Sequence, residues 1–342
     1  MSRKSKRVVL WSVAAVVAVV LAGVVSVEVA VRQKCVPSVA TVRIPSNATY
    51  AALLDSLRSG GVERVGVVDF WGRVRRLDSS FKGGNYRFGT DATPRSLVGR
   101  LRSGDQTPVR ITFNNVGSLG LLASRLSTQI EADSATIAAH LLAPETAENY
   151  GFSTETFLSM FIPDTYEVWW TLSPKALTDR MKTEYDRFWN SPDRAERLKE
   201  LKLTATEVYT LASIVYQETT LADEMPRIAG VYMNRLHRGI PLQACPTVKF
   251  ALGEPGLRRV LYKHTRIDSP YNTYINRGLP PGPIAMPSKA AIEAVLNYEH
   301  NDYLYFCAAD DFSGRNLFAK TLAEHNRNAR RYAAALNSAG IR

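Results

Sequence analysis

The hydrophobic positions of the chain open with one long uninterrupted run. Residues 8–27, VVLWSVAAVVAVVLAGVVSV, are twenty residues without an ionisable side chain. At about 1.5 Å per residue, a helix of this length covers about 30 Å, the thickness of a bilayer's hydrocarbon core. A cleaved signal peptide has a shorter apolar run of roughly 7–15 residues. We therefore expect an uncleaved transmembrane helix over residues 8–30. The basic residues in the preceding tail, residues 1–7, predict a cytoplasmic N-terminus and a chain that continues outside.

A second hydrophobic pattern is repeated in the first third of the chain. Residues 48–60, ATYAALLDSLRSG, match residues 92–104, ATPRSLVGRLRSG, at seven of thirteen positions, and residues 118–126 echo both. Each copy reads as a short helix with a Thr or Ser N-cap, and glycine ends the first two. Strand-like patterns at residues 39–45, 64–72 and 108–114 flank these helices. We expect small βα units over residues 36–148, which would bind short peptides or glycans, or act only as a spacer.

From about residue 150 the spacing of apolar positions becomes mainly helical. Amphipathic helices are predicted at residues 179–190, 192–203, from 205 onward, 226–239, 289–298 and 322–337. Long ordered loops separate several of them. The expected fold is therefore α+β: a cytoplasmic tail over residues 1–7, a transmembrane helix over 8–30, a small α/β domain over 36–148, and a mainly helical domain over 150–342.

One carboxylate lies where the helix that begins at residue 205 should pack. The apolar stripe of this helix is formed by Val208, Leu211, Ala212 and Val215, and Glu218 lies roughly 60° from the centre of that stripe. Thr210, Ser213 and Gln217 are expected on the opposite, solvated side. Partial burial would raise the pKa of Glu218 and suit it to general acid catalysis. Periodicity alone favours the simpler interpretation, a Glu218 that reaches water or pairs with Arg227.

Two loops favour the catalytic interpretation of Glu218 over the simpler one. Residues 161–170, FIPDTYEVWW, concentrate aromatic side chains beside Asp164 and Glu167. Residues 269–288 contain five prolines together with tyrosines, Asn and Thr. Prolines stiffen a loop, and aromatic faces beside amides and hydroxyls suit a sugar. The two loops together indicate a rigid groove for a glycan, although core packing is the commoner role of any single aromatic residue.

Charge and cysteine usage exclude several other classes of function. The net charge is +11, but residues 1–35 account for +5 of it. The remaining 307 residues have no basic run interleaved with aromatic residues, so we expect no nucleic-acid partner. The scattered histidines and cysteines have no metal-ligand spacing, and we expect no metal and no cofactor. Buried free thiols are the favoured state of Cys35, Cys245 and Cys307, with a Cys245–Cys307 disulfide as the alternative.

Several motifs, taken together and in order, resemble those of the YceG-like (MltG-type) endolytic murein transglycosylases. They are FIPDTY (161–166), LASIVYQET (211–219), NRLHRGIPLQACPTV (234–248), SPYNTY (269–274), GLPPGPIAMPS (278–288), YLYF (303–306) and TLAEHN (321–326). The resemblance covers nearly the whole chain. It implies a LysM-like domain at residues 36–148, a catalytic domain at 150–342 and one membrane span.

The resemblance also implies an activity and a location. Members of the family cleave peptidoglycan strands between N-acetylmuramic acid and N-acetylglucosamine and leave a 1,6-anhydro-muramyl end, which terminates nascent strands. The expected location is the bacterial cytoplasmic membrane, with the catalytic domain outside. The expected partners are glycan strands, the membrane itself and cell-wall synthases.

The same resemblance assigns roles to individual residues. The family's catalytic glutamate falls on Glu218, and many members have a second glutamate where this chain has Tyr216. Substrate-binding or positioning roles fall on Gln243, Tyr271, Asn272 and Thr273. Two positions depart from the family pattern: Cys245 stands where Asp is usual, and Asn316 where His is frequent.

Two other functions stay open on the sequence. One is a conventional muramidase that uses Glu218 with a second carboxylate, Asp164 or Glu167, because ordinary glycosidases need a pair of acids. The other is a noncatalytic scaffold that binds peptidoglycan.

Overall fold

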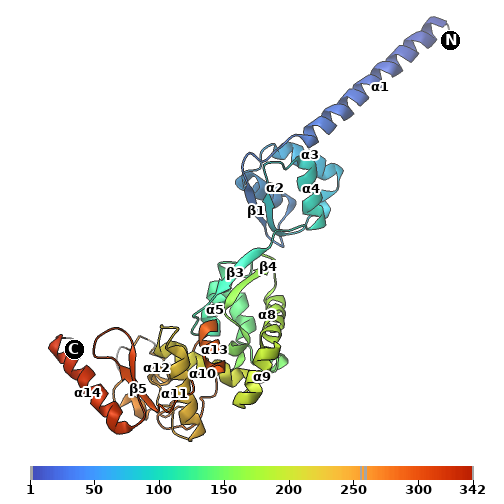
Figure 1. The fold of residues 1–342 in the computed structure, drawn as a ribbon. Coiled ribbons are helices and arrows are strands. Elements are labelled where there is room, and N and C mark those ends of the chain that lie inside the picture. The colour runs from blue at the N-terminus through green and yellow to red at the C-terminus, as the bar shows by residue number, and fades with distance from the viewer. Residues whose placement is uncertain (1–2, 255, 258–259, 341–342) are drawn as a thin grey trace. The chain divides into compact units, whose positions relative to one another are not determined.

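The computed structural model describes residues 3–254, 256–257 and 260–340 of the 342-residue chain (Figure 1). The fold is mixed α+β and mostly helical, as the sequence predicts. The chain divides into two compact units. Unit 1 comprises residues 1–111, 129–131 and 167–172, and unit 2 comprises residues 112–128, 132–166 and 173–342. Residues 112–128 and 132–148 thus group with the helical unit, whereas the sequence analysis assigned them to the first domain. This grouping describes packing, and the expected domain boundaries stay a prediction.

Unit 1 begins with a long apolar helix. Helix α1 (Arg3–Arg32) contains a stretch, Leu10–Arg32, that is long and apolar enough to cross a membrane, and it is the one such helix among the described residues. A small domain follows, with the elements β1 (Ala40–Ile44), α2 (Tyr50–Ser59), α3 (Val65–Val74), the 3₁₀ helix η1 (Leu77–Ser79), β2 (Gly84–Phe88) and α4 (Pro94–Ser103). Strands β1 and β2 pair antiparallel, with Ala40 opposite Phe88 and Ile44 opposite Gly84.

The repeat found in the sequence forms helices with the predicted caps. Thr49, Thr93 and Ser118 each accept a hydrogen bond at the start of α2, α4 and α5 (Leu119–Ser127), and Gly60 and Gly104 end the first two helices. The strands predicted at residues 39–45 and 108–114 are confirmed as β1 and β3 (Val109–Phe113).

The prediction of a strand at residues 64–72 is wrong, because this segment forms α3. Its buried residues, Val65, Val68 and Gly72, recur at helical spacing. The valine-rich composition suggested a strand, but this spacing buries one face of a helix against the core of the small domain. Residues 161–170, expected as a loop, contain strand β4 (Asp164–Val168), which pairs with β3.

Unit 2 is dominated by helices around a buried central one. Strands β3 and β4 have residues in both units. The other elements of unit 2 are α5, α6 (Ser134–Leu141), α7 (Pro144–Asn149), η2 (Phe157–Met160), α8 (Pro174–Trp189), α9 (Pro192–Leu201), α10 (Ala205–Glu218), α11 (Met225–His237), α12 (Cys245–Leu252), η3 (His264–Arg266), α13 (Lys289–Leu296), β5 (Tyr305–Ala308), β6 (Asn316–Ala319) and α14 (Leu322–Ser338). Strands β5 and β6 form an antiparallel pair. Helix α10 packs against α11, α12 and α13.

Because neighbouring elements surround α10, the prediction that Thr210, Ser213 and Gln217 lie on a solvated side is wrong in part. Gln217 is exposed, but Thr210 and Ser213 are buried. The Ser213 hydroxyl donates to the Thr210 carbonyl and accepts the backbone N–H of Ile284, at 2.6 and 3.1 Å. The side chain that periodicity placed in water therefore holds the proline-rich loop over residues 269–288 against the helix.

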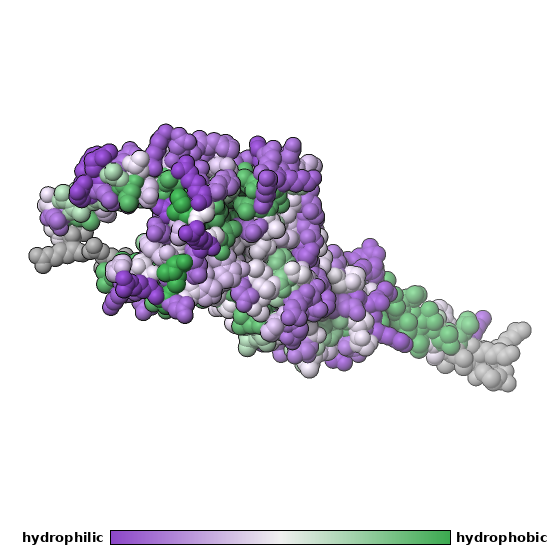
Figure 2. Space-filling view, turned by 90° about the horizontal axis from the view of Figure 1, so that it is seen from below, coloured by the Kyte–Doolittle hydropathy of each residue, from purple (hydrophilic) through white to green (hydrophobic). Residues whose placement is uncertain are grey.

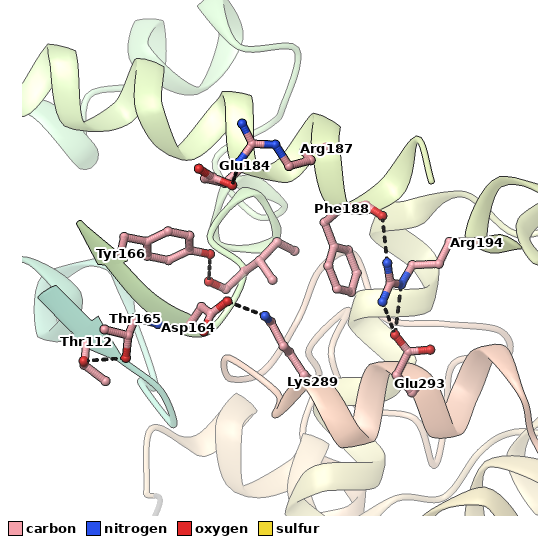
Figure 3. A network of polar contacts seen from close by, with 11 residues as sticks. Thr112, Asp164, Thr165, Tyr166, Glu184, Arg187, Phe188, Arg194, Lys289 and Glu293 are labelled. Atoms are coloured by element: carbon pink, nitrogen blue, oxygen red, sulfur yellow. Dashed lines mark hydrogen bonds and ion pairs between the residues drawn. The ribbon is translucent and has the colours of Figure 1, made fainter. Parts of the chain in front are cut away.

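Helix α13, which backs α10 and α11, is tied to two other elements by charged side chains (Figure 3). Lys289 pairs with Asp164 of β4. Glu293 accepts two hydrogen bonds from Arg194 of α9, at 2.6 and 2.9 Å, and the Arg194 guanidinium lies 3.9 Å from the ring of Phe188. These contacts fix the helix beneath the site described next.

Candidate active site

Glu218 is the last residue of α10. The helix begins with a complete capping box, in which Thr204 and Glu207 each accept from the other's backbone N–H. The apolar residues of α10 are buried, and Glu218 itself is partly buried. Arg227, its alternative partner in the sequence analysis, pairs instead with Glu299 at 2.9 Å. Neither simple interpretation of Glu218, full exposure or an ion pair with Arg227, therefore holds.

The partner of Glu218 is a tyrosine on the next helix. Tyr232, in α11, is 2% exposed, and its hydroxyl donates to Glu218 Oε1 at 2.8 Å. Its ring meets Phe306 edge-on, with centroids 5.9 Å apart. The tyrosine is thus held on both sides, and it fixes one oxygen of the carboxyl group.

Burial raises the pKa of Glu218 to about 7. The Tyr232 hydrogen bond and the positive charge of Lys249 act in the opposite direction but do not cancel the effect of burial. The position of Glu218 at the C-terminus of α10 also raises its pKa, since the negative end of the helix dipole disfavours a second negative charge. Near neutral pH this carboxyl group can hold a proton and can also release one.

Glu218 lies in a pocket of about 460 Å³. The walls come from α11, from the loop before α12, from β5 and β6 and from α14, and they include Tyr232, Arg235, Gln243, Tyr274, Tyr305 and His325. Glu218 is the one carboxylic acid among the described residues that line it, and neither Asp164 nor Glu167 is among them. The pocket therefore offers a single acid beside aromatic rings, an amide and a guanidinium.

Gln243 lines this pocket, and its backbone is held in an unusual conformation. Its φ is +53°, in the left-handed region that favours glycine. Its N–H donates to the Thr273 carbonyl at 2.9 Å, and its Oε1 accepts from Arg235 Nη1 at 3.2 Å. With the oxygen so engaged, the amide NH₂ of Gln243 is the group left for a ligand.

The other three predicted site residues lie outside the lining of this pocket. Asn272 is fully buried, and its amide donates to the carbonyls of Thr265 and Ile267, at 3.0 and 2.8 Å. Thr273 is 1% exposed and accepts from the Ala244 N–H at 3.0 Å. Tyr271 packs on Phe250, with ring centroids 4.7 Å apart. Asn272 and Thr273 therefore shape the loops that carry Gln243 and Tyr274.

Both positions that depart from the family pattern line the pocket. The Cys245 Sγ lies 3.1 Å from the Tyr274 hydroxyl. Asn316 donates through its backbone and side chain to the two carboxylate oxygens of Glu224, at 2.9 and 3.0 Å. Cys35, Cys245 and Cys307 are free thiols, which confirms the favoured state, although Cys245 and Cys307 are only partly buried.

Two important side chains were missed by sequence reasoning. Tyr232 has a hydroxyl on the apolar face of a helix, and such a group usually has a hydrogen-bond partner. Arg235 is 6% exposed, and its guanidinium donates to the carbonyls of Leu304 and Pro241 at 2.6 and 2.8 Å. It follows Val231 by four residues, so helical spacing already placed this charge on the buried side. Among the residues described, no cluster of three or more His, Cys, Asp or Glu side chains could hold a metal ion.

Comparison with known proteins gives consistent results. The sequence model of the YceG-like family matches residues 42–331. A Bacillus subtilis (strain 168) protein named endolytic murein transglycosylase is 44% identical over 140 residues, which cover 41% of this chain and 38% of that protein. The protein of the same name from Streptococcus pneumoniae D39 is 37% identical over 170 residues, 48% of this chain and 30% of that protein. The matches thus span well under half the length of these relatives.

A solved structure also matches. A crystal structure of a Listeria monocytogenes protein described as yceG-like superposes with a TM-score of 0.56 and 28% sequence identity. The match covers 85% of this chain and 98% of that one.

Proposed function

The chain belongs to the YceG-like family, and from that membership we propose that it is an endolytic transglycosylase of peptidoglycan. The proposed reaction breaks the bond between N-acetylmuramic acid and N-acetylglucosamine within a glycan strand and leaves a 1,6-anhydro-muramyl end. The observation that carries the proposal is Glu218, a single acid in its pocket with a pKa raised to about 7. The names of the relatives support the same reaction.

The first step is acid catalysis by Glu218. Its neutral carboxyl group donates a proton to the glycosidic oxygen as the bond to the muramyl anomeric carbon breaks, and the N-acetylglucosamine residue leaves with a free hydroxyl. A group with a pKa near the working pH suits this step. Tyr232 holds Oε1, so the proton is carried by the other oxygen, Oε2.

The second step needs no further carboxylate. The C6 hydroxyl of the same muramyl residue attacks its own anomeric carbon, and the ionised Glu218 accepts the proton that this hydroxyl loses. Attack within one sugar ring replaces both the water and the second acid of an ordinary glycosidase, whose carboxyl groups lie about 5 Å or about 6.5–9.5 Å apart. A pocket lined by one acid matches this requirement.

The four residues predicted to position the substrate are assigned three different roles. Gln243 would contact the sugar through its amide NH₂, because its oxygen is bound to Arg235. Asn272 and Thr273 are buried, so they would act by holding the loops in place. Tyr271, packed on Phe250, would extend the aromatic surface next to the pocket.

The location and partners follow from the apolar helix and from the substrate. We place α1 across the bacterial cytoplasmic membrane, with the N-terminus inside and the chain from about residue 32 onward outside, and we expect cell-wall synthases as protein partners. We assign the small domain of unit 1 a LysM-like role in binding glycan. One N-terminal helix of sufficient length and hydropathy supports the membrane anchor.

The test is a digestion of uncrosslinked glycan strands by the full chain in detergent, with products read by mass spectrometry. The wild type should release anhydro ends, and Glu218→Gln should release none while keeping its circular dichroism and melting temperature. Products heavier by one water would indicate the two-carboxylate hydrolase instead. Binding without cleavage by both proteins would indicate a scaffold.

A further inference from the structure

The net positive charge of this protein comes from its first third. Residues 36–111 contain twelve Lys and Arg against six Asp and Glu, whereas residues 112–342 contain twenty-five of each. Beyond the N-terminal helix, the net positive charge therefore lies within residues 36–111, the small domain of unit 1. A uniformly basic protein would spread this charge, so its concentration in one small domain calls for an anionic partner there.

The same domain has no linker between it and the apolar helix. Helix α1 ends at Arg32, and Cys35 and Val36 are already core residues of the small domain, 1% and 2% exposed. Three residues span at most about 10 Å. If α1 crosses a membrane, as the proposed function has it, some face of this domain must stay at the level of the lipid headgroups.

Contacts within unit 1 identify that face. The apolar run ends at Val27, and the next residue, Glu28, pairs with Arg95 of α4 at 2.6 Å. The Arg95 guanidinium lies 5.3 Å from the ring centre of Trp71 in α3. Residue 28 is within one turn of the edge of the hydrocarbon, and the headgroup layer is about 5–8 Å deep on each side. Helices α3 and α4 therefore meet α1 at headgroup depth. Figure 1 shows α3 beside the base of α1.

Helix α3 carries an apolar stripe on its outer side. Its inner face is buried, but Phe70 and Val74, four residues apart, are 51% and 57% exposed. Arg75 and Arg76 follow directly, are exposed, and form no ion pair with any described residue. The acids nearby are Asp69, which is bound to Arg73 at 2.9 Å, and the exposed Asp78. Figure 2 shows the apolar side chains of α1 as a green projection that meets hydrophilic, purple surface where the folded part begins.

We propose that the exposed stripe of α3, formed by Phe70 and Val74 with Arg75 and Arg76, docks on an anionic lipid surface. The apolar side chains enter the boundary between headgroups and acyl chains, and the arginines bind lipid phosphates. Such docking holds the small domain in one orientation on the bilayer. This inference rests on the proposed membrane anchor and does not depend on the chemistry of Glu218.

Photocrosslinking of the full chain in nanodiscs tests the proposal. Benzoylphenylalanine is placed at position 70, at position 74, or at position 39 as the matched control. Val39 is 55% exposed, lies in the same unit and follows the end of α1 by only seven residues. It therefore reports contact that results from tethering alone. The discs contain either phosphatidylcholine alone or phosphatidylcholine with phosphatidylglycerol.

The expected result is lipid adducts at positions 70 and 74 in the anionic discs, with at least fivefold less at position 39. Each arginine removed by Arg75→Gln or Arg76→Gln should lower the adduct yield at position 74 by about fivefold. Salt at about 1 M, which shortens the screening length to about 3 Å, should do the same.

Three outcomes would overturn the proposal. Equal adducts at positions 39 and 74 would mean contact by tethering only, and adducts to protein instead of lipid would mean that a second copy covers α3. A chain that does not enter the discs at all would refute the anchor on which the proposal rests. None of these outcomes bears on the proposed catalysis, which is read out from glycan products.

Discussion

At the scale of single residues, the central feature is a carboxyl group whose pKa is set by opposing influences. Burial raises the pKa of Glu218 to about 7, and the Tyr232 hydrogen bond lowers it. In the proposed reaction Glu218 must be protonated before the bond breaks. Activity should therefore fall as pH rises through about 7.

Tyr232→Phe should move this fall in activity to higher pH. The variant loses a hydrogen bond that favours the ionised form, and a typical bond of this kind corresponds to a change of up to about one pH unit. The turnover number should also drop, because Oε1 is no longer held. The measurement is the pH dependence of strand cleavage.

Tyr305→Phe is the control for that experiment. Tyr305 lines the same pocket, but its hydroxyl has no hydrogen bond with a described residue. Its pH profile should match the wild type. An unshifted profile for Tyr232→Phe would show that Tyr232 is only a packing residue.

Glu218 should also make the folded state less stable at high pH. Its pKa when folded, about 7, exceeds the ordinary value of 4.5, so the folded state binds the proton more tightly. The resulting stability is fully present below pH 4.5 and is lost as pH rises through 7.

Glu218→Gln removes the titrating group. Its free energy of unfolding at pH 9 should exceed that of the wild type by about 1–3 kcal/mol, allowing for the open pocket. Urea denaturation at pH 5 and 9 measures this, and a gain that is the same at both pH values would refute the assignment.

The sequence was sufficient to single out Glu218 but not to describe its surroundings. The 100° spacing placed it at the edge of the apolar stripe, and it is partly buried. The same spacing placed Ser213 in water, because a helical wheel cannot show that a loop 71 residues later will cover that side. Asn272 and Thr273 looked like ligands for the same reason: polar residue types do not reveal whether their partner is substrate or backbone.

At the scale of elements, close backbone approach positions α11 beside the site. Gly230 lies in the middle of this helix, and a Cβ at that position would come 2.3 Å from the Glu299 carbonyl oxygen. The helix that carries Tyr232 and Arg235 can therefore pack where it does only because residue 230 lacks a side chain.

Gly230→Ala should destabilise unit 2 although alanine is the better helix former. The clash with backbone should outweigh the gain in helix propensity of about 1 kcal/mol, for a net loss of about 1–3 kcal/mol. Gly120→Ala in α5 is the matched change in the same unit, since the nearest atom to its new Cβ, Ser118 Oγ, is 3.9 Å away. Melting temperatures should fall for the first variant and hold or rise for the second. A stable Gly230→Ala protein would contradict the close packing of α11.

Elements with strong local signals were predictable, and those set by distant contacts were not. The capping residues Thr49, Thr93 and Thr204 begin their helices as the sequence indicates. The segment 64–72 was mistaken for a strand because its valines favour strands, whereas the core of the small domain selects the helix. Strands β4 to β6 are short, and each is stabilised by a partner that local pattern does not reveal.

At the scale of the whole molecule, the two units divide the work. The apolar helix and the basic small domain belong to unit 1, and unit 2, which is nearly neutral, contains the pocket. This division is consistent with the proposed function, in which one part holds the chain at a membrane and another part cleaves glycan strands. The proposed mechanism needs one acid from the protein, and Glu218 is the one acid among the described residues that line the pocket.

The most direct test of this account is strand cleavage in water labelled with heavy oxygen. If the muramyl C6 hydroxyl is the nucleophile, the new ends contain no label, and Glu218→Gln forms no new ends. Labelled reducing ends would mean that water attacks the anomeric carbon, which would contradict the mechanism with a single carboxylate.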